Sequence, residues 1–343
     1  MIVTRTPFRV PLGGGGTDLP SYYSKYGGFI FSGAINKYMF IYINQPIVDD
    51  LIRVKYSKSE TVHSLDEVHH DLVREACRLH QIKDAIEIIS MADVPAGTGL
   101  GSSSCYIVGL LNGLHTLRKE YISLQALAEE ACKVEIDILK KPIGKHDQYM
   151  ATFGGLTVLD IDRDGSVHVR DAKVDRETID ALERNILLFY TGVSRKSLDI
   201  LSKQNSATQR DDKAVVDSLH TIKEIGCRVL EAVESGRVTE FGHLLHEHWT
   251  AKKKMSDRIS NPKINRIYET ARKNGALGGK IMGAGGGGFF MFYAEDKHRQ
   301  LRKAMKEEGL REMRYRFDFE GTKVIANFLD SRNGFFRNRV HAE

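Results

Sequence analysis

The stretch that most constrains this chain runs from Pro95 to Cys105 and reads PAGTGLGSSSC. Its glycines, Gly97, Gly99 and Gly101, stand at alternate positions, so the backbone is free to adopt positive φ and to approach a ligand closely. Three serines follow, where an apolar pattern of helical spacing begins over residues 107–117. The first turn of a helix presents unpaired N–H groups and the positive end of the helix dipole, and both attract phosphate.

A strand is expected directly upstream of this loop, over residues 85–89. The order of strand, glycine loop and helix predicts a site for nucleotide phosphates, and the alternative is a flexible loop before a core helix. The loop is not a Walker A motif, because no Gly-Lys-Ser/Thr closes it. Positive charge for the phosphates must therefore come from elsewhere in the chain.

The composition narrows the class of protein. With 343 residues, 41% hydrophobic and 28% charged, the chain is long enough for two domains with well-formed cores. The formal net charge of +5 is small and spread along the chain, which points to anionic small molecules and not to nucleic acid. Four separated cysteines without a CxxC pair favour a reducing compartment. Without an apolar signal core or an 18-residue apolar run, we expect a cytoplasmic protein with no membrane partner.

Two further glycine-rich stretches accompany the loop. Residues 1–18 combine a β-like run with four successive glycines and end in Thr17 and Asp18; a mobile hairpin tip is the alternative reading. Residues 280–290 read KIMGAGGGGFF, in which Gly283, Gly285 and Gly288 satisfy GxGxxG. A strand-like run follows them where a dinucleotide-binding fold requires a helix, so the Rossmann interpretation fails on context.

These stretches resemble, in the right order, the three signatures of the galactokinase, homoserine kinase, mevalonate kinase and phosphomevalonate kinase (GHMP) superfamily. The resemblance spans residues 7–290, and PxxxGLGSSS at 95–104 is its most specific part. It implies an α+β fold of two domains with the active site between them. Residues 1–184 would form an ATP-binding domain like domain 2 of ribosomal protein S5, and residues 185–343 a ferredoxin-like α+β domain.

The resemblance also implies ATP as phosphoryl donor, Mg²⁺ as cofactor, and roles for particular residues. Asp147 would orient or deprotonate the attacking hydroxyl, Arg9 would stabilise the transferred charge, and Ser103 and Glu135 would hold the metal. The phosphates would contact the loop residues Gly97, Thr98, Gly99, Leu100, Gly101, Ser102, Ser103 and Ser104.

Residue spacing alone leaves two of these roles open. Glu135 falls near the end of a helix that Ser123 is expected to cap, and a charge there is ordinarily solvated. Asp147 lies in the polar segment 142–155, which we expect to be a short connector of the kind that carries catalytic groups. Its neighbours Lys145 and His146 would add positive potential.

The glycines before Thr17 and Asp18 indicate the size of the acceptor pocket. Galactokinases have Glu-His where this chain has Gly15 and Gly16, so a wider pocket is expected, with Asp18 holding substrate hydroxyls. Together with KHDQY at 145–149, the tail GGGTD resembles the heptokinase branch, whose members phosphorylate C1 of a heptose 7-phosphate. The implied acceptor contacts are Gly15, Gly16, Thr17, Asp18, Lys145, Arg195, Gly285 and Gly286.

Within this acceptor site, Arg195 is the first choice for the phosphate of the sugar, because its planar fork can bind in bidentate fashion. The alternatives are an L-fucose-type or other sugar 1-kinase, and a non-catalytic sensor of sugar and ATP. ATP and a phosphorylated sugar are the expected partners, and a homodimer is left open.

Beyond residue 184 the pattern predicts a strand at 186–191, helices at 210–235, 238–250, 262–274 and 296–308, and a final strand pair near 314–328 that completes the second domain. His243, His246 and His248 lack the spacing of a helical metal site, so no metal is expected there.

Overall fold

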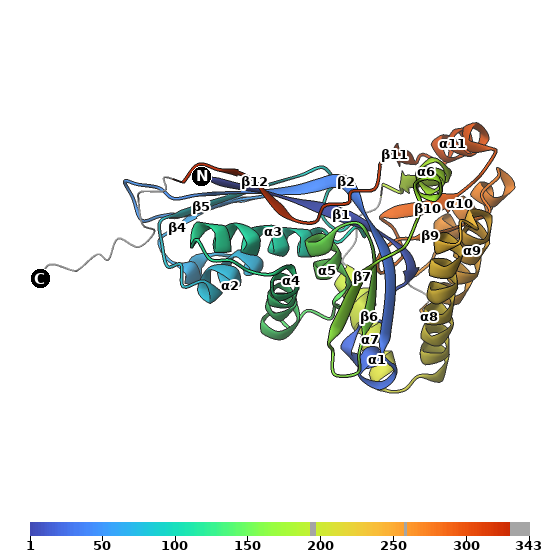
Figure 1. The fold of residues 1–343 in the computed structure, drawn as a ribbon, viewed down its shortest axis with the longest axis horizontal. Coiled ribbons are helices and arrows are strands. Elements are labelled where there is room, and N and C mark those ends of the chain that lie inside the picture. Colours follow the sequence, from blue (N-terminus) through green and yellow to red (C-terminus); the bar gives the residue numbers. More distant parts are fainter. Residues whose placement is uncertain (193–196, 257–258, 330–343) are drawn as a thin grey trace, which may run out of the picture.

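The computed structural model describes residues 1–192, 197–256 and 259–329. These residues form two α+β parts, each built on its own sheet, and the long strands at the N-terminus run from one part towards the other (Figure 1). None of the helices in the described part is long and apolar enough to cross a membrane.

The first part is organised around β1 (Ile2–Gly14) and β2 (Gly28–Asn44), which pair antiparallel along most of their length. Aromatic and β-branched residues fill β2, as suits a strand buried on both faces over its first half. The sheet has eight strands; a path β12-β1-β2-β5-β3-β4 is extended by β6, which pairs with β2, and by β7. The other strands are β3 (Ile52–Lys55), β4 (Ser59–Val62), β5 (Ile86–Ala92), β6 (Leu156–Ile161), β7 (Val167–Asp171) and β12 (Lys323–Asn327).

Helix α3 (Ser102–Leu117) packs across β1 and β2 and forms the centre of this part (Figure 1). Small residues permit the close approach: a Cβ on Gly109 would lie 2.8 Å from Oγ1 of Thr6. The hydroxyl of Thr4 donates to the Gly109 carbonyl at 2.9 Å. The remaining helices of this part are α1 (Pro20–Tyr26), η1 (Leu65–Glu67), α2 (Asp71–Leu79), α4 (Leu124–Cys132), η2 (Lys133–Ile138) and α5 (His146–Phe153). Helix α6 (Arg176–Asn185) follows them in the chain and packs against the other part.

Two local predictions need correction here. The segment 142–155, expected to be a connector, contains helix α5, most of whose residues, among them Tyr149, Met150 and Ala151, are buried in the core. The helix expected to run past Glu135 is α4, capped by Ser123 as predicted, followed by the π-helical turn η2. A π-turn rotates the following side chains relative to an α-helix, and such turns recur at functional sites.

The second part is a four-stranded antiparallel sheet in the order β11-β8-β10-β9. Numbered along the chain this order is fourth, first, third, second, so the expected ferredoxin-like arrangement is confirmed. Its strands are β8 (Ile186–Tyr190), β9 (Gly278–Ile281), β10 (Phe289–Tyr293) and β11 (Arg311–Met313), and the helices are α7 (Ser197–Gln209), α8 (Lys213–Glu234), α9 (Val238–Lys253), α10 (Pro262–Lys273) and α11 (His298–Glu307).

The last strand departs from the prediction. The expected strand pair near 314–328 does not form, because β11 joins the second sheet while β12 pairs with β1 in the first. β12 supplies hydrogen-bond partners to the edge of β1, which would otherwise be exposed. The chain thus crosses from the second part back to the first, and the domain boundary at residue 184 stays a prediction.

Candidate active site

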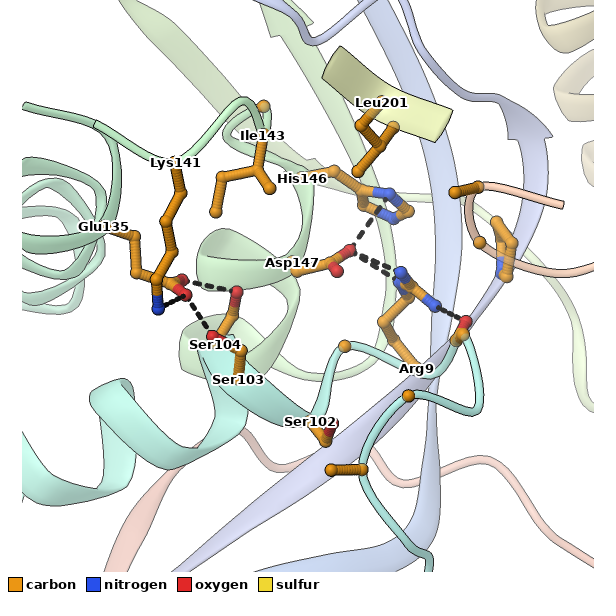
Figure 2. A pocket seen from close by; sticks show the side chains of 18 of the residues that line it. Arg9, Ser102, Ser103, Ser104, Glu135, Lys141, Ile143, His146, Asp147 and Leu201 are labelled. Carbon is orange, nitrogen blue, oxygen red and sulfur yellow. Dashed lines mark hydrogen bonds and ion pairs between the residues drawn. The ribbon is translucent and has the colours of Figure 1, made fainter. Parts of the chain in front are cut away.

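A cavity of about 1110 Å³ is lined by residues of both parts. The first part contributes the end of β1, the loop before α3 and the start of α5; the second contributes α9 and the end of β9. Figure 2 shows the centre of this cavity, where side chains from β1, α3, η2 and α5 converge.

The glycine loop before α3 has the conformation that its sequence requires. Gly97, Gly99 and Gly101 all have positive φ, and Gly101 is the left-handed residue from which α3 begins. Its serines Ser102, Ser103 and Ser104 occupy the first turn of the helix and line the cavity. The side chains of Thr98 and Leu100 are buried away from it, so these two residues can offer only backbone groups to a ligand.

The third glycine stretch packs against this loop, backbone to backbone. A Cβ on Gly99 would lie 2.7 Å from the Met282 carbonyl oxygen, and the Phe289 N–H donates to the Thr98 carbonyl at 3.2 Å. Gly283 and Ala284 line the cavity. Glycine is therefore required where the two loops approach each other most closely.

The acceptor role predicted for Gly285 and Gly286 does not match their placement. Both pack against Ile259, to whose carbonyl the Gly286 N–H donates at 2.7 Å, and neither lines the cavity. Of the stretch 283–288, only Gly283 and Ala284 line the cavity.

Arg9 and Asp147 meet at the centre of the cavity (Figure 2). The guanidinium of Arg9 contacts Oδ1 of Asp147 through Nε at 2.8 Å and Nη2 at 2.6 Å, and its Nη1 donates to the Gly99 carbonyl at 2.7 Å. Burial would raise the pKa of Asp147, but the charge of Arg9 outweighs it and holds that pKa below its usual value. Asp147 is therefore ionised at neutral pH.

Glu135 lies at the other side of α3's first turn, completely buried. Its carboxylate accepts hydrogen bonds from Ser103 and, at 2.7 Å each, from Ser104 and Gln148. The predicted pair of Ser103 and Glu135 is thus in direct contact, brought together by the π-turn η2. Sequence reasoning missed Gln148, which follows Asp147 directly.

Lys141 supplies the positive charge that the glycine loop itself lacks. Its ammonium lines the cavity, 3.5 Å from Oε1 of Glu135 and 3.6 Å from Asp71 (Figure 2). Lys141 stands outside all three signature stretches, so nothing in the sequence marked it as a site residue.

The glycine run after β1 forms another wall. Gly15 has open space where a side chain would lie, and Gly16 faces Gln204. Asp18 is buried and accepts a hydrogen bond from the His146 N–H at 3.2 Å. Burial, with the nearby Asp147 charge, raises the pKa of Asp18 to about 6. Thr17 does not line the cavity, since its hydroxyl is bonded to the backbone of Phe29.

The residues expected to add positive potential beside Asp147 do not do so. Lys145 turns away from the cavity and donates to Glu129 at 3.0 Å and to the Gly165 carbonyl at 2.8 Å. His146 lines the cavity, but burial and the Arg9 charge lower its pKa to about 3, so it is neutral. Arg195 lies outside the described residues.

Four further cavity residues were not identified from the sequence as ligand contacts: Gln204, His248, Lys252 and Lys280. Lys280 belongs to the third signature stretch, of which only the glycines were considered. His248 was judged only as a metal ligand. Each of the four is a polar residue within an apolar helix face or strand, and this pattern could have indicated a ligand contact.

Two family descriptions match the chain on either side of this cavity. Residues 67–155 match the GHMP kinases N terminal domain, and residues 229–310 match GHMP kinases C terminal. The chain belongs to the GHMP kinase superfamily. GHMP kinases transfer a phosphoryl group from ATP to an alcohol, so the chain is a phosphotransferase of that kind.

Similar proteins include sugar kinases of this superfamily. The D-glycero-alpha-D-manno-heptose 7-phosphate kinase of Campylobacter jejuni is 28% identical over 339 residues, covering 94% of this chain and 97% of the relative. The L-fucokinase/L-fucose-1-P guanylyltransferase of Bacteroides fragilis is 26% identical, covering 89% of this chain and 36% of the relative. A crystal structure of a Bacteroides thetaiotaomicron D-glycero-D-manno-heptose 1-phosphate kinase has a TM-score of 0.78 at 24% identity, covering 96% of this chain and all of that one. At that identity, the last shows a shared fold.

Proposed function

We propose that this GHMP kinase transfers the γ-phosphoryl group of ATP to the C1 hydroxyl of D-glycero-D-manno-heptose 7-phosphate, giving the 1,7-bisphosphate. The reaction would serve the cytoplasmic synthesis of nucleotide-activated heptose for capsule or lipopolysaccharide. The observation that carries the proposal is the Arg9–Asp147 pair, which lines the same cavity as the phosphate loop and the glycine run at residues 14–16. The Campylobacter relative, similar over nearly its whole length, supports the choice of sugar.

The chemistry follows from these placements. The sugar oxygen attacks the γ-phosphorus while the bond to the bridging β–γ oxygen breaks, and ionised Asp147 orients the hydroxyl or takes its proton. Arg9 stabilises negative charge on the transferred group and keeps Asp147 ionised. Asp18 would hold other sugar hydroxyls.

The nucleotide would extend along the cavity from the serines of α3. Beyond them the cavity is lined by Tyr56, His70 and Tyr106, and the rings of His70 and Tyr106 stack with centroids 4.6 Å apart. A purine base suits such an aromatic wall. In this arrangement Lys141 faces the phosphates.

The residues around Glu135 fit a magnesium ion. A carboxylate and the Ser103 hydroxyl are oxygen ligands, which Mg²⁺ prefers, and both lie at the helix end where the phosphates would bind. When bound, the ion neutralises charge on the donor phosphates. Ser104 and Gln148 hold the Glu135 carboxylate in place.

An L-fucose-type 1-kinase is the second candidate, favoured by the Bacteroides fragilis relative. The test is ATP turnover with a panel of heptose 7-phosphate, unphosphorylated heptose, L-fucose and mannose, followed by phosphorus NMR of the product. The proposal expects heptose 7-phosphate to have the highest kcat/KM and the new phosphate on C1. A higher kcat/KM for L-fucose would establish the second candidate, and no turnover of any sugar would indicate a sensor.

A further inference from the structure

Lys280 is a buried lysine without a counter-charge. It lies on β9, is 1% exposed, and its ammonium donates to the Leu12 carbonyl at 3.1 Å. No carboxylate in the described part of the chain lies within ion-pair distance of it. A buried ammonium without a partner carboxylate is unfavourable, and an anion bound beside Lys280 would compensate its charge.

The surroundings of Lys280 add positive charge. Lys252 of α9 donates to the carbonyls of Ile281 at 3.0 Å and Gly283 at 2.6 Å, on both sides of the end of β9. Burial lowers the pKa of Lys280 well below its usual value, and the charges of Lys252 and Arg9 lower it further. An anionic ligand bound here would reverse this effect.

Two buried polar atoms at the same end of the cavity have no partner within the described residues. They are Nδ1 of His248 and Nε2 of Gln204. His248 must donate from Nε2 to the Gly14 carbonyl at 2.8 Å, and burial lowers its pKa, so neutral His248 presents Nδ1 as an acceptor. The Gln204 amide is a donor. This end of the cavity therefore offers cations, one donor and one acceptor.

We propose that this end of the cavity is the subsite for the acceptor's own phosphate monoester, with Lys280, Lys252 and Gln204 holding the phosphate and His248 accepting from a sugar hydroxyl. The inference rests on the proposed function and assigns to these residues the role that the sequence had suggested for Lys145 and Arg195.

A phosphoryl group here could also be the one in transfer from ATP. The anchoring contacts favour the acceptor: Lys280 and His248 donate to the carbonyls of Leu12 and Gly14, directly before Gly15, which has open space beside it. The donor side already has Arg9 and Lys141 as cations. The acceptor's phosphate and the phosphoryl group in transfer from ATP predict different kinetics for a Lys280 variant.

The first experiment compares Lys280→Met with Lys223→Met, using heptose 7-phosphate and unphosphorylated heptose as acceptors. Lys223 is the matched control, because its ammonium also bonds backbone carbonyls, those of Tyr26 and Gly27, but does not line the cavity. Lys280→Met should lower kcat/KM for the phosphorylated acceptor at least about 30-fold and change the unphosphorylated one by less than about threefold. An equal loss on both acceptors would overturn the inference and place Lys280 on the transferred group.

The second experiment uses inorganic phosphate, so that it does not depend on the identity of the sugar. With the donor site filled by a non-hydrolysable ATP analogue and magnesium, phosphate should raise the Tm of the parent and of Lys223→Met, but not of Lys280→Met. Without phosphate, Lys280→Met should be at least as stable as the parent, because it removes a buried amine that has no counter-charge. An equal phosphate-induced shift in all three proteins would reject the subsite even if heptose 7-phosphate proves to be the substrate.

Calorimetry of phosphate binding in buffers of different ionisation enthalpy provides a third readout. If the anion restores the charge of Lys280, binding should take up a proton in the parent and not in Lys280→Met. The titratable or charged groups that face Lys280 are Lys252 and His248 of α9, Arg9 of β1 and His146 of α5. Uptake that is unchanged in Lys280→Met would assign the proton to His248 or His146 and contradict this part of the inference.

Discussion

Arg9 connects the glycine loop before α3 to Asp147: its Nη2 lies 2.6 Å from Oδ1 of Asp147, and its Nη1 donates to the Gly99 carbonyl at 2.7 Å. The guanidinium thus holds the loop and the Asp147 carboxylate together, which in the proposed function are the donor site and the group that acts on the acceptor. The same contact holds the pKa of Asp147 below its usual value, against the burial that would raise it.

Replacing Asp147 by Asn should lower kcat on the order of 10²-fold or more, because a neutral amide cannot accept the hydroxyl proton. The KM for ATP should change little, since the loop and the first turn of α3 are retained. Steady-state kinetics with both substrates varied would measure this. Near-parental turnover would assign Asp147 a structural role, as the partner of Arg9.

Replacing Glu135 by Gln should weaken the Mg²⁺ dependence of the reaction, so that more metal is needed for half-maximal rate. Asp137→Asn is the matched control, because Asp137 lies on the same π-turn but is exposed and does not line the cavity. A titration of activity against Mg²⁺ compares the two variants. If Asp137→Asn needed more Mg²⁺ for half-maximal rate and Glu135→Gln did not, Asp137 and not Glu135 would be assigned to the metal site.

Asp18 should make folding stability depend on pH. In the folded protein its pKa is about 6, above the usual value of 3.8, so the folded state binds the proton more tightly than the unfolded state. Its contribution is full below about pH 4 and is lost as the pH rises through about 6. Asp18→Asn should therefore raise the free energy of unfolding at about pH 7.5, by on the order of 1–3 kcal/mol, and have less effect at about pH 4.

Urea unfolding of the parent and Asp18→Asn at both pH values measures this difference. Asn keeps a carbonyl oxygen to accept from the His146 N–H, so the contact itself is preserved. An equal effect at the two pH values would show that Asp18 does not titrate in this range.

The glycine run should set the size of the acceptor. A Cβ on Gly16 would lie 2.6 Å from Nε2 of Gln204, and φ there is +76°, so Gly16→Glu should lower kcat/KM for the acceptor by on the order of tenfold or more while KM for ATP is unchanged. Gly309→Glu shares the positive φ, at +80°, but lies outside the cavity and controls for backbone strain. Full use of heptose 7-phosphate by Gly16→Glu would show that the run does not determine substrate size.

The sequence predicted best what depends on neighbours along the chain. The cap at Ser123, strand β6 and helices α8 to α11 follow local rules, and they lie where expected. Helix α7 was not predicted. The contact of Ser103 with Glu135 could be expected only from the family resemblance, because the π-turn that aims Glu135 breaks the helical period.

What escaped prediction depends on contacts between distant segments. Lys280 is held by the Leu12 carbonyl and His248 by the Gly14 carbonyl, both far away in the sequence. Neither residue is distinctive within its own strand or helix. Lys145 stands two residues before Asp147 in the sequence, yet its ammonium donates to Glu129, outside the cavity. The partner of β12 is likewise the first strand of the chain.

Because β12 returns to the first sheet, the second part is inserted into the chain of the first part before its last strand. The chain therefore crosses between the two parts twice. Two connections restrain relative motion more than one would, so opening and closing of the cavity is expected to be a hinge rotation about the line that joins them, with little twisting. A fragment ending before residue 323 would lose both this second connection and the strand that covers the edge of β1.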